Sequence, residues 1–262
     1  MEILSLVPDT VFKIGPIAVT NAHLALMLVT LLIAIFGLYV AGTARLVPTR
    51  AQTAMELSVF WLYDRIRPMV ADRRYANFVF ALIATIFLTI VVSNLFFLLP
   101  LSSIVFETAK SHGELFRVPT SHLSLTLALG VMVVILSHVL ALSISPWRQI
   151  NHFVRIDALL KTRSVGGALN ALLEVFLGIL EIIGQISRVI SISARLFGNI
   201  FAGEVMVAVI IKLTAATGFI VPIPFYALNI FVGVIQAMVF TLLSAQYIGG
   251  MIEGVATPHG EH

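Results

Sequence analysis

The chain has 262 residues, of which 59% are hydrophobic and only 11% are charged, whereas a soluble domain carries roughly 25% charged residues. Its mean hydropathy of +1.04 therefore predicts a membrane protein, and its small net charge of +3 argues against nucleic-acid binding. The absence of cysteine excludes disulfides and metal sites built from thiolates.

Three apolar runs in the first part of the chain are long enough to cross a bilayer. Residues 1–20 form a short leader that lacks the basic start and the cleavage site of a secretory signal. Residues 22–42 predict the first spanning helix, and residues 76–100 and 121–145 predict the second and third. A polar loop at 102–119 separates the last two of these spans.

The segment 49–67 is amphipathic instead of uniformly apolar. Thr49 and Gln52 match a capping box at its start. The helix that follows has one apolar stripe: Met55, Val59, Leu62 and Ile66. Two interpretations are open, because such a helix lies either in the membrane interface, against lipid or a partner, or on the loops of its own chain.

The last part of the chain predicts a long helical hairpin. Residues 168–217 form a helical run without proline, about 75 Å long, against a hydrocarbon layer of about 30 Å. This helix must therefore tilt steeply or break. A last helix, 224–250, follows a proline turn. The predicted fold is a single all-α polytopic membrane domain, 1–262, with five membrane helices and one interfacial helix.

Basic residues are distributed unevenly between the loops. Six arginines lie in 43–75, and three arginines and one lysine lie in 146–167, whereas only four basic residues lie in the other connections and ends. Because positively charged loops stay inside, we expect the amino terminus outside and the carboxyl terminus inside. Five crossings satisfy this arrangement, since it requires an odd number.

One face of the long helix is charged, although its surroundings are apolar. Four charged residues recur there every seven residues: Glu174, Glu181, Arg188 and Arg195. Asn199 falls on the same face, since seven residues make about two turns. Glu204 points to about the opposite side, at 100° per residue. The long helix therefore presents its arginines and Glu204 to different neighbours.

Arg195 is the residue whose position most needs an explanation, because a charge at the centre of a bilayer costs several kcal/mol. In one interpretation it pairs with Glu181 or another buried acid and holds helices together. In the other it faces a water-filled site, or a carboxylate of another protein. Arginine stays protonated, so it would act there as an electrostatic gate and not as a proton relay.

Other polar residues could hold water or protons near this arginine. The Glu204 carboxyl can titrate in a poorly solvated site. Asn199, Gln236 and Asn229 either hold water or make interhelical hydrogen bonds. Gln236 and Asn229 share a face, and a simple antiparallel hairpin places Gln236 abreast of 204–207. For His122 and His138, ordinary loop and helix contacts are the favoured interpretation.

The run from Arg195 to Glu204, RLFGNIFAGE, resembles subunit a of the F-type ATP synthases. The segment 94–100, with its Asn-Leu and closing proline, also resembles this family, as do 119–129 and 236–240. Glu181, fourteen residues before Arg195, matches a recurrent acid. The resemblance is strong over about 94–250 and weak before Pro48.

The resemblance implies the stationary part of a rotary motor, without cofactor or metal, while ATP chemistry takes place on other subunits. The implied partners are a ring of c subunits, the peripheral stalk b subunits, the other ATP synthase subunits and the lipid bilayer. Ions would pass through two half-channels, and the proton is favoured over sodium as the transported ion. The implied location is a bacterial plasma membrane, or alternatively the mitochondrial inner membrane.

The resemblance also suggests roles for single residues. Arg195 would separate the two half-channels and meet the ring carboxylate, and Glu204, Asn199 and Gln236 would line them. Asn229 stands where bacterial relatives often have histidine, and His122 stands where they often have an acid. These two departures change the outer path, because asparagine cannot titrate whereas histidine can.

A self-contained secondary transporter or channel is the alternative. It would be expected to show an inverted repeat or a matching pair of broken helices, and neither is evident in the sequence. A transporter should conduct ions by itself, whereas a stator subunit should do so only with its ring.

Overall fold

The structure, a computed structural model, describes residues 10–14, 17–43, 48–70, 73–95, 105–108, 111–114, 118–149, 165–213 and 220–256. Five of the described helices are long and apolar enough to cross a membrane: α1 (Asn21–Gly42), α3 (Arg73–Leu95), α4 (Leu123–Ile144), α7 (Val165–Leu213) and α8 (Pro222–Ala256). The predicted fold class, an all-α polytopic membrane protein, is therefore confirmed.

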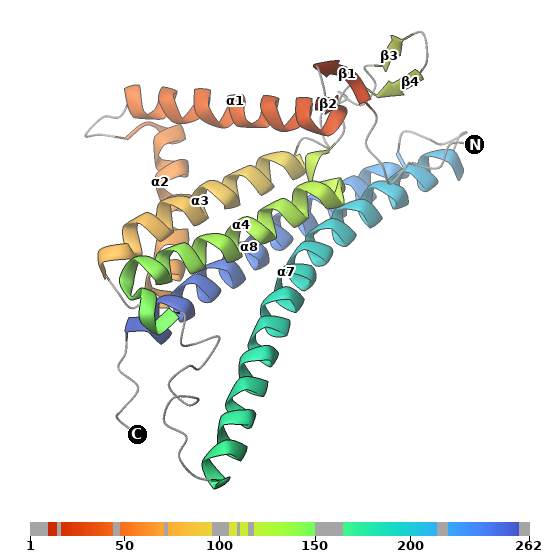
Figure 1. Cartoon of the computed structure of the whole chain (residues 1–262). Helices are drawn as coiled ribbons and strands as arrows, with labels where there is room; N and C mark the ends of the chain where they lie inside the picture. The colour runs from red at the N-terminus through yellow and green to blue at the C-terminus, as the bar shows by residue number, and fades with distance from the viewer. Residues whose placement is uncertain are drawn as a thin grey trace.

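Two short hairpins were not predicted from the sequence. Strand β1 (Thr10–Ile14) pairs antiparallel with β2 (Ile17–Thr20), and β3 (Val105–Thr108) pairs with β4 (Ser111–Glu114). Both hairpins lie at one end of the helices, in segments expected to be leader and loop (Figure 1). The first is rich in β-branched residues, which favour extended backbone.

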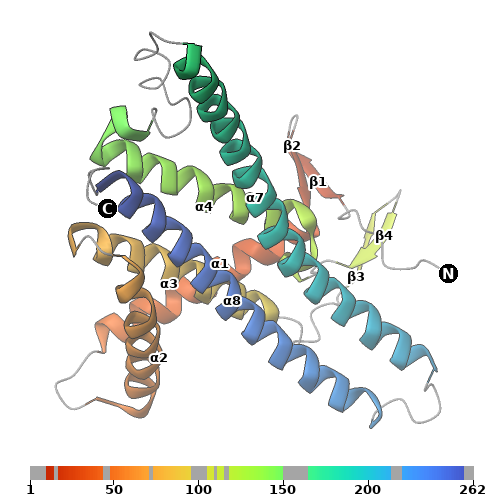
Figure 2. The ribbon, with the colours of Figure 1, turned by 90° about the horizontal axis from the view of Figure 1, so that it is seen from below.

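The helices α3, α4 and α8 form the centre of the molecule, where α8 packs against α3, α4 and α7 (Figures 1 and 2). Helix α1 contacts mainly α3 and lies at the edge. The buried side chains of α3 recur every three or four residues, as expected for one core-facing stripe: Val79, Ile83, Ile86 and Ile90. They meet Leu196, Phe240 and Ile248 in one apolar cluster.

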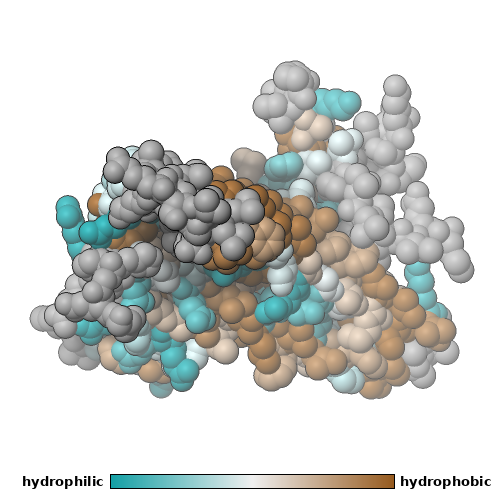
Figure 3. All heavy atoms as spheres, turned by 60° about the horizontal axis from the view of Figure 1, so that its bottom comes forward, coloured by the Kyte–Doolittle hydropathy of each residue, from teal (hydrophilic) through white to brown (hydrophobic). Residues whose placement is uncertain are grey.

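Large apolar side chains outside this cluster are exposed on the isolated chain. Met27 and Leu38 of α1 are 68% and 75% exposed, and α7 carries many more. The described surface on the right of Figure 3 is mostly apolar, whereas hydrophilic residues gather at the left. Apolar surface of this extent marks contact with lipid or with other membrane helices.

Helix α2 (Arg50–Ile66) ends in a short 3₁₀ turn, η1 (Arg67–Met69). Thr49 caps it by accepting a hydrogen bond from the backbone N–H of Gln52, which is one of the two bonds of the predicted capping box. Its stripe packs on the molecule's own core, because Leu62 and Ile66 are buried there. Among the described elements its packing partners include α3 and α8, and other apolar residues of α2 stay exposed.

Helix α7 is continuous over 49 residues, so the expected alternative of a broken helix does not occur. Its apolar part, Val175–Leu213, contains 39 residues. At 1.5 Å per residue this is about 58 Å, so a straight helix would need a tilt of about 60° to stay within a hydrocarbon layer of about 30 Å. The length of α7 therefore predicts a helix that is strongly inclined to the membrane normal.

Candidate functional site between helices α7 and α8

The hairpin of α7 and α8 is joined by polar and small residues at mid-length. Asn199 Nδ2 donates a hydrogen bond to Gln236 Oε1 at 2.6 Å. One turn further along α7, the backbone at Gly203 lies so close to the side chain of Asn229 that a Cβ would collide with it. Gly203 thus allows Asn229 to sit between the helices, in the manner of small residues at membrane helix interfaces.

This register differs from the predicted one, in which Gln236 lay abreast of 204–207. Gln236 faces Asn199 instead, more than one turn away along α7. The difference arises from the helix ends, since α7 is described as helical to Leu213 and α8 begins at Pro222. Proline is tolerated there because the first turn of a helix needs no backbone donor.

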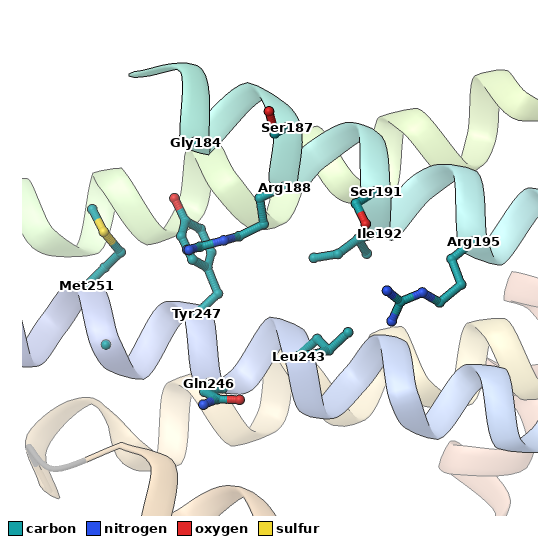
Figure 4. Close-up of a pocket in the computed structure, with 11 residues that line it drawn as sticks. Gly184, Ser187, Arg188, Ser191, Ile192, Arg195, Leu243, Gln246, Tyr247 and Met251 are labelled. Atoms are coloured by element: carbon teal, nitrogen blue, oxygen red, sulfur yellow. The ribbon is translucent and has the colours of Figure 1, made fainter. Parts of the chain in front are cut away.

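The Arg195 side chain points from α7 toward α8, into a pocket of about 790 Å³ (Figure 4). The residue is exposed, and it forms no hydrogen bond or ion pair with another residue that the structure describes. Glu181 lies fourteen residues away, about 21 Å along the helix. The geometry therefore argues against the interpretation in which Arg195 pairs with Glu181.

The other end of the pocket holds a network of polar side chains. The Arg188 guanidinium lies 4.3 Å from the centre of the Tyr247 ring. The Tyr247 hydroxyl forms a short hydrogen bond with Gln185 Oε1, and Gln185 Nε2 donates to Glu181 Oε1 at 2.6 Å. A continuous polar path thus runs from Glu181 to Arg188 and links α7 to α8.

Glu204 lies on the other side of α7, as the helical spacing predicted. It is 6% exposed, whereas Arg195 is exposed in the pocket. Glu204 comes nine residues after Arg195, and at 100° per residue this spacing puts the two side chains on different sides of the helix. A carboxyl group and a guanidinium are therefore kept apart on one helix, facing different surroundings.

His122 is buried near the same part of α7. It is 1% exposed and follows η4 (Pro119–Ser121), which packs on α7. Gly130 of α4 lies against Ser193 of α7, and the two helices run antiparallel (Figures 1 and 2). His122, about 12 Å back along α4, thus falls abreast of about residue 201, within one turn of Glu204.

A family model described as ATP synthase A chain matches residues 23–249. The chain belongs to the ATP synthase subunit a family. It is 31% identical to the ATP synthase subunit a of Gloeobacter violaceus over 253 residues, covering 96% of this chain and 90% of that protein. The corresponding proteins of Syntrophobacter fumaroxidans (31% identity, 83% of this chain and 78% of that protein) and Citrifermentans bemidjiense (32%, 85% and 84%) are also similar.

Membership of this family makes the chain a membrane-sector subunit of an F-type ATP synthase. The residues that the sequence analysis proposed for ion translocation lie in three places. The first group lies on the hairpin face: Arg195, Asn199 and Gln236. The second is buried beside that face, namely Glu204, Asn229 and His122, and Glu181 lies at its far end. Among the residues that the structure describes, no group of three or more His, Asp or Glu could hold a metal ion.

Sequence reasoning missed two polar contributions to this subunit a. Asn94 Nδ2 donates to the carbonyl of Gly233 at 2.9 Å, and Thr120 Oγ1 donates to Asn94 Oδ1 at 2.7 Å, so one amide joins α3, η4 and α8. Asn94 was noted only for its resemblance. Tyr247 was also missed, although it lies eleven residues after Gln236, three turns along the same face of α8.

Proposed function

We propose that this subunit is the stationary, ion-translocating part of the ATP synthase membrane sector, and that it works against a ring of c subunits. The observation that carries the proposal is the Arg195 guanidinium, which points into an open pocket between two membrane helices and has no acid among the described residues beside it. A charge in that position is costly unless a partner or water compensates it. An ionised carboxylate on a moving neighbour would do so.

The chemistry follows from the fixed charge of arginine. Arg195 attracts an ionised ring carboxylate and repels a free proton, and it can neither give nor accept a proton itself. It therefore separates an outer from an inner aqueous path. A ring carboxylate passes it only after losing its proton on one side, and it must be protonated again on the other.

The outer path uses the buried polar residues beside α7. Glu204 and His122 carry a carboxyl and an imidazole group, which are the groups suited to passing protons, and they lie within about one turn of each other by the helix register. Asn229, held against Gly203, can hold water but not carry a proton itself. We assign the proton-carrying role on this path to Glu204 and His122, with Asn199 and Gln236 orienting water between them and Arg195.

The inner path uses the other end of the hairpin, where Gln185 links Glu181 to Tyr247. The distribution of basic residues among the loops supports an inner position for this end, with the amino terminus outside and the carboxyl terminus inside. The membrane is the plasma membrane of a bacterium, in line with the bacterial origin of the matching relatives. ATP chemistry takes place on other subunits, and peripheral stalk b subunits hold this one in place.

Replacement of Arg195 by alanine tests the proposal. The Arg195→Ala variant, assembled in the complex, should lose coupled ATP synthesis and ATP-driven proton pumping, because nothing then prevents a protonated carboxylate from passing between the two paths. Both activities are measured in sealed vesicles, together with passive proton flux.

The matched control is Lys212→Gln, which removes an exposed cation from the far end of the same helix and should leave coupling unchanged. Normal ATP-driven pumping by an assembled Arg195→Ala complex would refute the assignment.

A further inference from the structure

Arg188 is a second guanidinium in the pocket that holds Arg195. Both are exposed, and both extend from α7 toward α8 (Figure 4). Of the titratable residues, only Arg188, Arg195 and Tyr247 line this pocket, so no carboxylate of the described chain balances its charge there. Glu181 does not line the pocket and is reached from it only through Gln185. Helix α4 also packs on α7, and its titratable residue is His138.

Tyr247 orients the Arg188 side chain, whose five N–H donors outnumber those that this one neighbour can take up. The Arg188 Cζ lies over the Tyr247 ring, 4.3 Å from the ring centre. The N–H groups lie in the guanidinium plane, where they can donate to a carboxylate in a paired arrangement. Tyr247 is itself fixed by its hydrogen bond to Gln185. Arg188 is therefore held ready for an anion that the chain does not supply in this pocket.

The distance between the arginines matches the spacing of packed helices. Seven residues advance about 10.5 Å along α7. With the tilt of about 60° deduced from its length, the sideways component of this step is about 9 Å. Helices that pack side by side have axes about 8–10 Å apart. Two neighbouring ring helices could thus present their carboxylates to Arg195 and Arg188 at the same time.

We propose that Arg188 is a second cation station, which binds the carboxylate of the ring subunit next to the one at Arg195, on the inner side. This inference rests on the proposed function. At this station the neutral carboxyl group releases its proton to water in the pocket, and the carboxylate that remains is stabilised by the Arg188 guanidinium. The carboxylate then moves on to Arg195 already ionised.

The inner-pH dependence of ATP synthesis tests this role. An opposite charge nearby lowers a carboxyl pKa by about 1–3 units. Without Arg188 the ring carboxylate therefore holds its proton more tightly, and release needs a more alkaline interior. In vesicles with assembled complexes, Arg188→Gln should raise the inner pH for half-maximal synthesis by about one unit. The outer-pH dependence should stay the same.

Arg188→Lys keeps the charge and should restore most of the inner-pH profile, and Lys212→Gln should leave it unchanged. An inner-pH profile of Arg188→Gln equal to that of the parent overturns the inference, while loss of coupling in Arg195→Ala still supports the proposed function.

Should Arg188→Gln fail to assemble with the ring, Tyr247→Leu decides the question. It removes the stacking surface but keeps the charge, so it should give a smaller shift in the same direction. No shift in that variant also overturns the inference.

Discussion

At the residue scale, the hairpin keeps Arg195 and Glu204 on different sides of one helix. Arg195 and Arg188 face the open pocket, where water or a partner can compensate them. Glu204 is buried on another side of α7. Since the two arginines cannot titrate and the carboxyl can, the two faces are suited to different tasks.

The Glu204→Gln variant separates proton transfer from packing. Glutamine has nearly the same shape and can make the same number of hydrogen bonds, but it cannot exchange a proton. We expect proton flux through assembled complexes to fall by at least about a hundredfold, the lower end of the range for loss of a proton-transferring group. The amount of c subunit that co-purifies should stay close to that of the parent, and unchanged flux would remove Glu204 from the path.

At the element scale, close backbone contacts fix how α8 sits among its neighbours. A Cβ at Gly249 would collide with the backbone carbonyl of Met69, so α8 approaches η1 as closely as a glycine allows. Next to it, a Cβ at Gly250 would meet no atom within 4 Å. Packing therefore requires the absence of a Cβ at Gly249 but not at Gly250.

The pair Gly249→Ala and Gly250→Ala tests this contact. Gly249→Ala should destabilise the subunit by about 1–3 kcal/mol, because backbone cannot move aside as a flexible side chain does. Gly250→Ala should be neutral or stabilise by up to about 1 kcal/mol, since alanine favours helix. Thermal unfolding of the detergent-purified complex measures both, and equal midpoints for the two variants would contradict the prediction.

At the scale of the whole molecule, the tilt of α7 decides how the subunit can meet a partner. An upright helix would offer one or two turns at a given depth, whereas α7 offers a long strip of one face within the membrane. Its many exposed apolar side chains lie along that strip. Under the proposed function, a ring of c subunits would move along this strip, because its exposed side chains are mostly apolar.

Orientation in the membrane can be measured directly, because the chain has no cysteine of its own. Thr10→Cys lies in an exposed position before α1, and Gly254→Cys lies in an exposed position near the end of α8. In sealed right-side-out vesicles, a membrane-impermeant maleimide should label Thr10→Cys at once and Gly254→Cys only after lysis. The cysteine-free parent is the control, and the reverse pattern would invert the proposed topology.

The sequence by itself determined the number of membrane helices, the shared face of Arg188 and Arg195, and the separation of Arg195 from Glu204. These depend on apolar length and on helical periodicity, which are local properties. Only the tertiary structure decided the register of Asn199 against Gln236, the burial of His122 beside α7, and the stack of Arg188 on Tyr247. Such contacts depend on where helices end and how closely they pack, and no pattern within one helix contains that information.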